Sequence, residues 1–406
     1  MKKKYLILGS FAFSLAFTRA QSPDSTFPNI NKTEIEILYN QYSQDGNHSA
    51  VTGGTGTEKL TVYGPSLSYK RSSGKNIFGF QLGSDIISSA STDNIDFVIS
   101  SASRMDTRSY TDINYTRLFE KSGLAVNAGL GLSIESDYFS FAKYLGISKA
   151  SDDKMRNFFA QIQLLNDDLR WGRLNPDYYK PVKLIYPVEL RDQDWFDIYH
   201  RYSGNLNIGF TQITDRQNIL GIFTYFGIQE GLLSTPFHRI YFNDSSLAVE
   251  KLPDLRIKGS LAFRWNRFLN GNIVIKNALG GYIDNFGIVA LWIENETAVK
   301  LGYQWTIIPN LRIYSQKGSG FFAPYKEHTV DEEFYTSDYD LSPLSSGKFG
   351  VGIRYKSLSI KKLTLNAITA RYFFYTQSNG LAAHALTLLL NFHFKHETPR
   401  LKKASK

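Results

Sequence analysis

The segment LRIKGSLAFRWN, residues 255–266, decides the fold because apolar and polar residues alternate along it. Successive side chains of a β-strand point to opposite faces, so one face of this segment is apolar and the other is polar. The apolar positions are Leu255, Ile257, Leu261, Phe263 and Trp265, and the polar positions are Arg256, Lys258, Ser260, Arg264 and Asn266. Such a strand separates an apolar environment from water.

The same alternation recurs along most of the chain, notably in residues 124–135, 293–305 and 385–394. The segments are about 10 to 18 residues long, which suits strands that cross a membrane at a tilt. We count about sixteen candidate strands and accept about fourteen to eighteen, an even number being typical of bacterial barrels. They lie near residues 33–43, 56–71, 75–90, 107–119, 122–137, 138–149, 154–169, 196–213, 217–230, 253–268, 271–283, 287–305, 309–323, 346–357, 360–376 and 381–395.

The connections between these strands alternate in length. Outer-membrane barrels have short periplasmic turns and long extracellular loops, so short and long connections should follow one another. The short ones are residues 71–75, 119–123, 148–154, 214–218, 268–272, 306–310 and 357–361, and the longest, 42–55, 91–106, 168–194, 231–253 and 323–346, all fall between them. The sequence therefore predicts an all-β fold, a transmembrane antiparallel up-and-down β-barrel with short periplasmic turns and long extracellular loops.

The composition excludes several classes of protein. The 406 residues include no Cys, which excludes disulfides, Cys-ligated metal centres and a thiol nucleophile. Aromatic residues make up 15% of the chain, more than is usual in a soluble domain. The formal net charge is +9, and without Lys2, Lys3, Lys4 and Arg19 it falls to about +5. This excess is too small and too dispersed for a nucleic-acid partner.

The N-terminus has the features of a secretory signal peptide. Lys2, Lys3 and Lys4 precede an apolar stretch, residues 5–17, and small residues flank Arg19 at the expected cleavage site after Ala20. An N-terminal anchor is the alternative, but the stretch is shorter than the roughly 20 residues that span a bilayer. We therefore expect Sec export, a cleaved signal peptide (1–20), an N-terminal periplasmic segment (21–32), a transmembrane barrel (33–395) and a basic C-terminal tail (396–406).

The last predicted strand ends with Phe392 and Phe394, which resemble the C-terminal aromatic signal read by the barrel-assembly machinery. Pairs of aromatic residues also occur near the ends of other predicted strands, where their rings would lie at the depth of the lipid headgroups. We therefore expect the cell outer membrane as the location, its lipid and lipopolysaccharide as surroundings, and the assembly machinery as a partner during biogenesis.

Several motifs carry a resemblance to a known family. They are QDG (44–46), TGGTGTE (52–58), DIISSAS (85–91), LPDLR (252–256), YIDNFGI (282–288) and PNLRIYSQ (309–316). From about Asn40 to the last strand, the chain resembles the bacterial outer-membrane family catalogued as domain of unknown function 3570. The resemblance implies a barrel in a Gram-negative bacterium and brings no established activity.

The alternation also predicts which charged side chains face the inside of the barrel. These candidate lumen-lining residues are Lys70, Arg108, Asp112, Glu135, Arg256, Lys258, Arg264, Glu294, Glu296, Lys300 and Arg354. Interior charges must be hydrated or paired, and the sequence leaves both possibilities open. If they are hydrated, the basic residues of segment 255–266 would favour the passage of anions.

Other candidate sites are weaker. Five acidic residues lie in segment 331–340, but the segment lacks a calcium-loop pattern, and we interpret it as solvated. The Gly- and Thr-rich segment 45–58 has no phosphate-loop motif and is interpreted as a flexible surface loop. A barrel lipase or protease needs a histidine beside a serine or an acidic residue near one rim. The loops offer weak candidates for such a pair, His238 with Asp244 and His328 with Asp331. We expect no catalytic residue, cofactor or metal.

The sequence thus predicts an integral outer-membrane barrel, and a porin-like channel or transporter for small solutes is the favoured function. A closed structural barrel that serves as an accessory or scaffold subunit of a cell-surface complex, with surface lipoproteins as possible partners, is the alternative. A barrel enzyme of the lipase or protease type is third.

Overall fold

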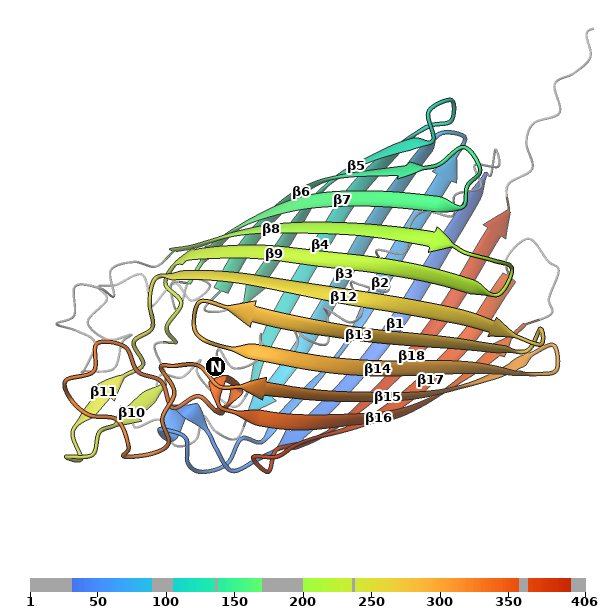
Figure 1. Ribbon diagram of the computed structural model, residues 1–406. Helices are drawn as coiled ribbons and strands as arrows, with labels where there is room; N and C mark the ends of the chain where they lie inside the picture. Colours follow the sequence, from blue (N-terminus) through green and yellow to red (C-terminus); the bar gives the residue numbers. More distant parts are fainter. Residues whose placement is uncertain are drawn as a thin grey trace, which may run out of the picture.

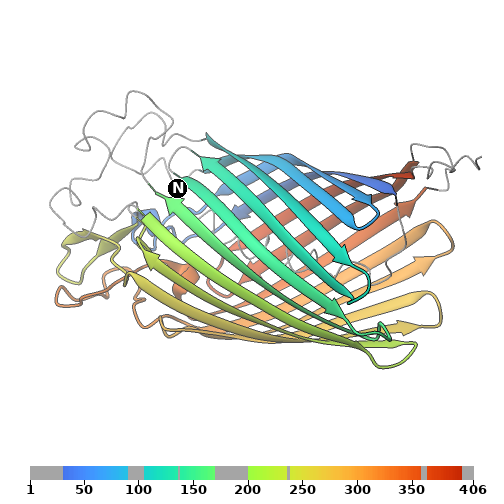
Figure 2. The ribbon, with the colours of Figure 1, turned by 90° about the horizontal axis from the view of Figure 1, so that it is seen from above.

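The chain folds into one closed barrel of sixteen antiparallel strands (Figures 1 and 2). The computed structural model describes residues 31–89, 105–135, 138–169, 200–235, 238–357 and 364–395. The barrel strands are β1 (Lys32–Asp45), β2 (Leu60–Ser73), β3 (Asn76–Ser89), β4 (Met105–Phe119), β5 (Leu124–Glu135), β6 (Tyr138–Ala150), β7 (Arg156–Asp168), β8 (His200–Ile213), β9 (Asn218–Gly231), β12 (Leu255–Leu269), β13 (Ile273–Asp284), β14 (Val289–Leu301), β15 (Trp305–Lys317), β16 (Leu344–Lys356), β17 (Thr364–Gln377) and β18 (Ala382–Lys395). The predicted fold class and strand number are confirmed.

The barrel closes where the first and last strands pair. β1 and β18 are antiparallel over their whole length, from Lys32 opposite Lys395 to Asp45 opposite Ala382. Phe392 and Phe394 therefore lie opposite Ile35 and Thr33, at the end of the barrel where β1 begins. This pairing leaves the sixteen-strand sheet without an edge, which is what a strand-built wall needs inside a membrane.

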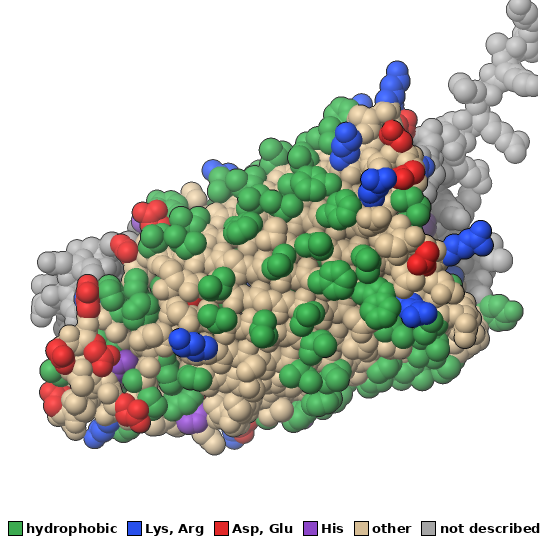
Figure 3. Space-filling view, viewed as in Figure 1, with side chains coloured by type: hydrophobic (Ala, Val, Ile, Leu, Met, Phe, Trp, Pro, Cys, Tyr) green, Lys and Arg blue, Asp and Glu red, His purple; other side chains and the backbone are tan. Residues whose placement is uncertain are grey.

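The outer face of the wall is apolar. Leu291, Ile283 and Leu261 leave 66%, 60% and 59% of their surface exposed, values that water would disfavour for so many leucines and isoleucines. Figure 3 shows apolar side chains spread over the barrel wall, whereas most charged side chains gather towards its two ends. The arrangement matches the lipid-facing belt of a transmembrane barrel. Among the described residues, no helix is long and apolar enough to cross a membrane.

The two ends of the barrel differ in the length of their connections. One end carries tight turns, such as that between β2 and β3, and the other carries longer segments, residues 46–59, 232–254 and 318–343. The longer segments hold a small two-stranded sheet, β10 (Arg239–Tyr241) with β11 (Leu247–Val249), and the 3-10 helices η1 (Ala50–Thr52) and η7 (Tyr339–Leu341). We call the described residues of segments 46–59, 232–254 and 318–343 the loop cap.

One predicted turn is misplaced. The sequence predicts a short connection at residues 306–310, but β15 begins at Trp305 and contains these residues. The turn lies instead at residues 302–304, where the backbone φ of Gly302 is 69°.

 This φ of 69° at Gly302 is one that residues with a side chain rarely adopt, which explains why the chain reverses there. Pro309 has no N–H, and the β14–β15 pairing is interrupted beside it, between Glu296 opposite Asn310 and Val299 opposite Ile307.

Lys143 interrupts the apolar outer face. It lies near the middle of β6, directly opposite the outward-facing Leu130 of β5 and Leu164 of β7, and its side chain is exposed. A lysine at the midplane of a bilayer destabilises a barrel by about 2–4 kcal/mol, and the cost falls to about 0–1 kcal/mol near the headgroups.

We predict that Lys143→Leu raises the free energy of unfolding by about 2 kcal/mol, because it removes a charge from the lipid-facing belt. Lys149→Leu is the matched control, since Lys149 lies on the same face of β6 but close to the turn. Denaturant unfolding of the protein in lipid bilayers measures both values. Equal effects of the two substitutions would contradict this placement of the membrane.

Candidate functional site

The inner face of the barrel wall carries most of the predicted charged residues, and many of them have partners on other strands. On β4, Arg108 donates from Nε to Ser133 Oγ over 3.0 Å and lies directly opposite Asp85 of β3. Asp112 accepts a hydrogen bond of 2.9 Å from the Tyr144 hydroxyl of β6. Glu135, at the end of β5, is fully buried. Hydrogen bonds of this kind line one side of the interior.

The predicted residues of β12 have three different environments. Arg256 forms a 2.5 Å ion pair with Asp284 of β13, and Tyr282 also donates to that carboxylate. Lys258 donates to Gln229 of β9 over 2.7 Å. The Arg264 guanidinium lies 4.7 Å from the centre of the Phe223 ring, close enough for a cation–π interaction.

Glu296 of β14 joins two basic residues. Lys276 of β13 and Arg371 of β17 each place a nitrogen 2.9 Å from a carboxylate oxygen of Glu296. Because β15 and β16 lie between β14 and β17, and neighbouring strands are about 4.8 Å apart, Arg371 reaches across the inside of the curved wall. The neighbouring Glu294 accepts from Asn310 over 3.2 Å and lies 4.0 Å from Lys348. This part of the interior is partly filled by paired charges.

Three of the predicted residues lie near the end of the barrel that carries the tight turns. Lys70, Lys300 and Arg354 are exposed there, and the Lys300 ammonium lies 5.8 Å from the centre of the Phe268 ring. They belong to one rim of the barrel, whereas the residues of β12 and β14 described above lie along its wall.

Acidic and basic side chains of the inner face are unevenly distributed around the barrel. On β1–β7 the inner acidic residues outnumber the basic Lys32, Lys70 and Arg108; they are Glu34, Glu36, Asp85, Asp112, Glu135 and Asp167. On β12–β17 the inner basic residues outnumber the acidic Asp284, Glu294 and Glu296; they include Arg256, Lys258, Arg264, Lys276, Arg312, Lys348, Arg354 and Arg371. β4 and β14 are eight places apart in the ring of sixteen, so the two arcs face one another across the interior (Figure 1).

Large aromatic side chains of the inner face lie against the wall, above glycines of the neighbouring strand. Five such pairs stand directly opposite each other in the sheet, and a Cβ added to any of these glycines would come within 2.5 Å of the ring. They are Gly83 with Tyr110, Gly129 with Tyr144, Gly209 with Phe159, Gly280 with Trp292 and Gly350 with Phe373. The absent side chains let the rings lie flat and cover the backbone.

We predict that Gly350→Ala lowers the free energy of unfolding by about 1–3 kcal/mol, because the added methyl overlaps the Phe373 ring. Gly131→Ala is the matched control on the same inner face, since its Cβ would meet no atom closer than 3.5 Å. Adding Phe373→Ala should remove most of the extra cost of Gly350→Ala. Denaturant unfolding measures all four variants, and additive effects of the pair would argue against this packing.

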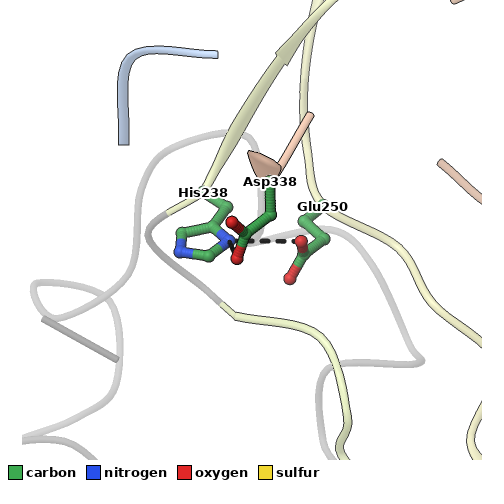
Figure 4. A group of neighbouring side chains, drawn as sticks. All are labelled: His238, Glu250 and Asp338. Atoms are coloured by element: carbon green, nitrogen blue, oxygen red, sulfur yellow. Dashed lines mark hydrogen bonds and ion pairs between the residues drawn. The ribbon is translucent and has the colours of Figure 1, made fainter. Parts of the chain in front are cut away.

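The loop cap contains a second group of interacting side chains. His238, Glu250 and Asp338 are all buried and turn towards one another (Figure 4). His238 Nδ1 lies 3.1 Å from Glu250 Oε1 and 3.7 Å from Asp338 Oδ2. Three ligand atoms from these residues lie within 4.8 Å of one another.

The interpretation of the loop histidines and acidic residues needs correction. His238 contacts Glu250 and Asp338, whereas Asp244 accepts hydrogen bonds from Ser246. Asp338 is buried, so segment 331–340 is not simply solvated.

The partner of His328 also differs from the expected one. His328 Nδ1 lies 2.5 Å from Glu332, and its Nε2 lies 3.0 Å from the Thr336 carbonyl oxygen. Burial opposes ionisation of Glu332, but the Thr329 N–H and His328 outweigh it and hold the pKa of Glu332 below its usual value. The contact with the Thr336 carbonyl joins the two ends of segment 328–336.

Segment 45–58 packs into the loop cap and is more than a surface loop. Ala50 and Val51 are buried, and the His48 ring stacks on Tyr339 at 3.8 Å between ring centres. A Cβ on Gly53 would lie 2.6 Å from the Tyr241 ring. All three segments of the loop cap therefore contact one another.

The sequence does not predict the group of His238, Glu250 and Asp338, because the spacing of these residues along the chain matches no metal-binding or catalytic motif. The Thr336 hydroxyl that supports Glu250 is 86 residues away in sequence, and only the folded loops bring the two together. The signal peptide, most of the N-terminal segment and the basic tail lie outside the described residues.

Comparisons with known proteins identify a family and several similar structures. The sequence profile of the family described as "Protein of unknown function (DUF3570)" matches residues 6–388. No curated protein matches the chain.

Similar solved structures include a BenF-like porin from Pseudomonas fluorescens Pf-5, with 11% identity, a TM-score of 0.41, and coverage of 91% of this chain and 100% of that one. Pseudomonas aeruginosa OccK1 (OpdK) has 9% identity, a TM-score of 0.41 and coverage of 91% and 100%. A bacterial polysaccharide outer membrane secretin has 8% identity, a TM-score of 0.45 and coverage of 89% and 98%.

Proposed function

The chain belongs to the DUF3570 family, whose function is unknown, and we propose from its geometry that it is an outer-membrane channel for small polar solutes, with a preference for anions. The observation that carries the proposal is the uneven distribution of charge on the inner face, with an excess of acidic residues on β1–β7 opposite an excess of basic residues on β12–β17.

The apolar outer face supports the membrane location. A closed barrel pairs its backbone groups between strands, and its exposed leucine, isoleucine and phenylalanine side chains suit lipid. Barrels of this kind are typical of bacterial outer membranes, and export through Sec with a cleaved signal peptide is part of the proposal. Lipid and lipopolysaccharide would surround the barrel, and the assembly machinery would insert it.

The inner face supports conduction. Acidic and basic arcs that face each other create an electric field across the interior, which orients polar solutes and aligns their charges with the walls. The aromatic rings that lie flat above glycines cover the wall while projecting little towards the axis. On β12 and β15, Lys258 and Arg312 add positive charge to the basic arc, which favours anions over cations.

We predict stepwise ion conductance of the purified protein in planar bilayers, with a reversal potential in a salt gradient that indicates anion preference. Lys258→Glu should shift the reversal potential towards cation preference, because it reverses a charge on the inner face. Lys149→Glu, on the outer face of β6 near a turn, is the control and should leave selectivity unchanged. A folded, heat-modifiable sample that conducts no ions would contradict the channel proposal.

A closed scaffold barrel is the second candidate, and the Lys276–Glu296–Arg371 group favours it. These paired charges bridge strands that are not neighbours and fill part of the interior. In that case the loop cap would be the contact surface for a cell-surface partner such as a lipoprotein. Arg371→Gln removes one of these ion pairs. If neither the wild-type protein nor Arg371→Gln conducts ions, the scaffold is supported. Neither candidate includes catalysis.

A further inference from the structure

His238, Glu250 and Asp338 bring together the side-chain types of a zinc site in a buried part of the loop cap. Their side chains are 3%, 2% and 8% exposed. His238 and Glu250 flank the small sheet of β10 and β11, whereas Asp338 precedes η7 in a different segment (Figure 4). The group therefore joins residues 232–254 to residues 318–343.

The spacing of the three atoms fits tetrahedral coordination. Zn²⁺ binds imidazole nitrogen and carboxylate oxygen at about 2.0–2.2 Å, which places neighbouring ligand atoms of a tetrahedron about 3.4 Å apart. His238 Nδ1 lies 3.1 Å from Glu250 Oε1 and 3.7 Å from Asp338 Oδ2, so the observed separations lie on either side of this value. The three ligand atoms lie within 4.8 Å of one another, so side-chain adjustment can bring all of them to one ion.

Neighbouring groups hold the two carboxylates in position. Thr336 Oγ1 donates to Glu250 Oε1 over 2.6 Å, and the Thr235 N–H donates to Oε2 over 2.6 Å. The Asp340 N–H donates to Asp338 Oδ1 over 3.0 Å, which orients the other oxygen towards His238. Hydrogen bonds to ligands from the surrounding shell are a regular feature of metal sites.

We propose that His238 Nδ1, Glu250 Oε1 and Asp338 Oδ2 bind a divalent cation, Zn²⁺ by preference, which fastens the loop cap. The imidazole ligand favours Zn²⁺ over Ca²⁺ and Mg²⁺, which prefer oxygen. Two carboxylates and a neutral imidazole match the charge of the ion. The imidazole proton then resides on Nε2, which is buried and makes no hydrogen bond to any described residue. The proposal is independent of whether the barrel conducts.

The test is zinc binding by the full-length protein, purified in detergent without a histidine tag and stripped with a chelator. Elemental analysis after dialysis against Zn²⁺ should give one ion per chain, and competition with a chromophoric chelator gives the affinity. The chain contains no Cys that could bind zinc elsewhere. Co²⁺ bound in place of Zn²⁺ should give the strong visible absorption of a tetrahedral site.

Asp338→Asn and His238→Gln each remove a proposed ligand and should weaken zinc binding by more than about 100-fold. Loss of a residue that only hydrogen-bonds to a ligand already lowers metal affinity by about 10–100-fold. Thr336→Val should weaken it by about 10-fold, and Thr336→Ser should restore it. Asp331→Asn, in the same segment but exposed, is the matched control.

Limited proteolysis supplies a second readout. Zn²⁺ should protect the loop cap of the wild-type protein and of Asp331→Asn from cleavage, but not that of Asp338→Asn. Heat-modifiable migration in gels identifies variants that have not folded, and these are set aside. Failure of the folded wild-type protein to bind Zn²⁺ stoichiometrically, or binding that Asp338→Asn and His238→Gln leave unchanged, would overturn the proposal and leave a metal-free hydrogen bond between His238 and Glu250.

Discussion

The pairing of β1 with β18 is the interaction on which the rest of the structure depends. Inside a membrane an unpaired backbone N–H or C=O is costly, and a sheet of sixteen strands with two open edges would expose a row of them on each. The β1–β18 ladder removes both edges at once. Once the ring is closed, the alternation of side chains fixes an outer face for lipid and an inner face that accommodates most of the polar residues of the wall.

This constraint explains why charged and aromatic side chains are concentrated on the inner face. Charged residues that cannot face lipid turn inward, where they are paired, as Arg256 is with Asp284, or remain close to water at the rim, as Lys70 does. The aromatic rings above glycines follow from the same geometry, because a ring that projected straight inward would occupy the interior. The loop cap then adds a second, separate group of buried polar side chains at one end.

The fold could be predicted from sequence because the two-residue period of segment 255–266 and the alternating connection lengths are local signals. The turn predicted at residues 306–310 is wrong by a few residues, because Gly302 provides the left-handed backbone that the turn uses and β15 runs through Pro309. The group of His238, Glu250 and Asp338 could not be predicted, since it depends on the three-dimensional path of two loops. The partners of Glu296 were equally hidden, because Arg371 reaches it across two intervening strands.

Alternate residues of one strand face lipid and water, and the absence of Cys from the chain allows this to be measured directly. Single cysteines replace Leu311, Arg312, Ile313 and Tyr314 of β15 in turn, and the variants are reconstituted in liposomes and exposed to a charged, membrane-impermeant maleimide. The structure predicts labelling at positions 312 and 314, on the inner face, and protection at 311 and 313. Uniform labelling, or labelling at 311 and 313 alone, would contradict a lipid-facing exterior and a water-accessible interior.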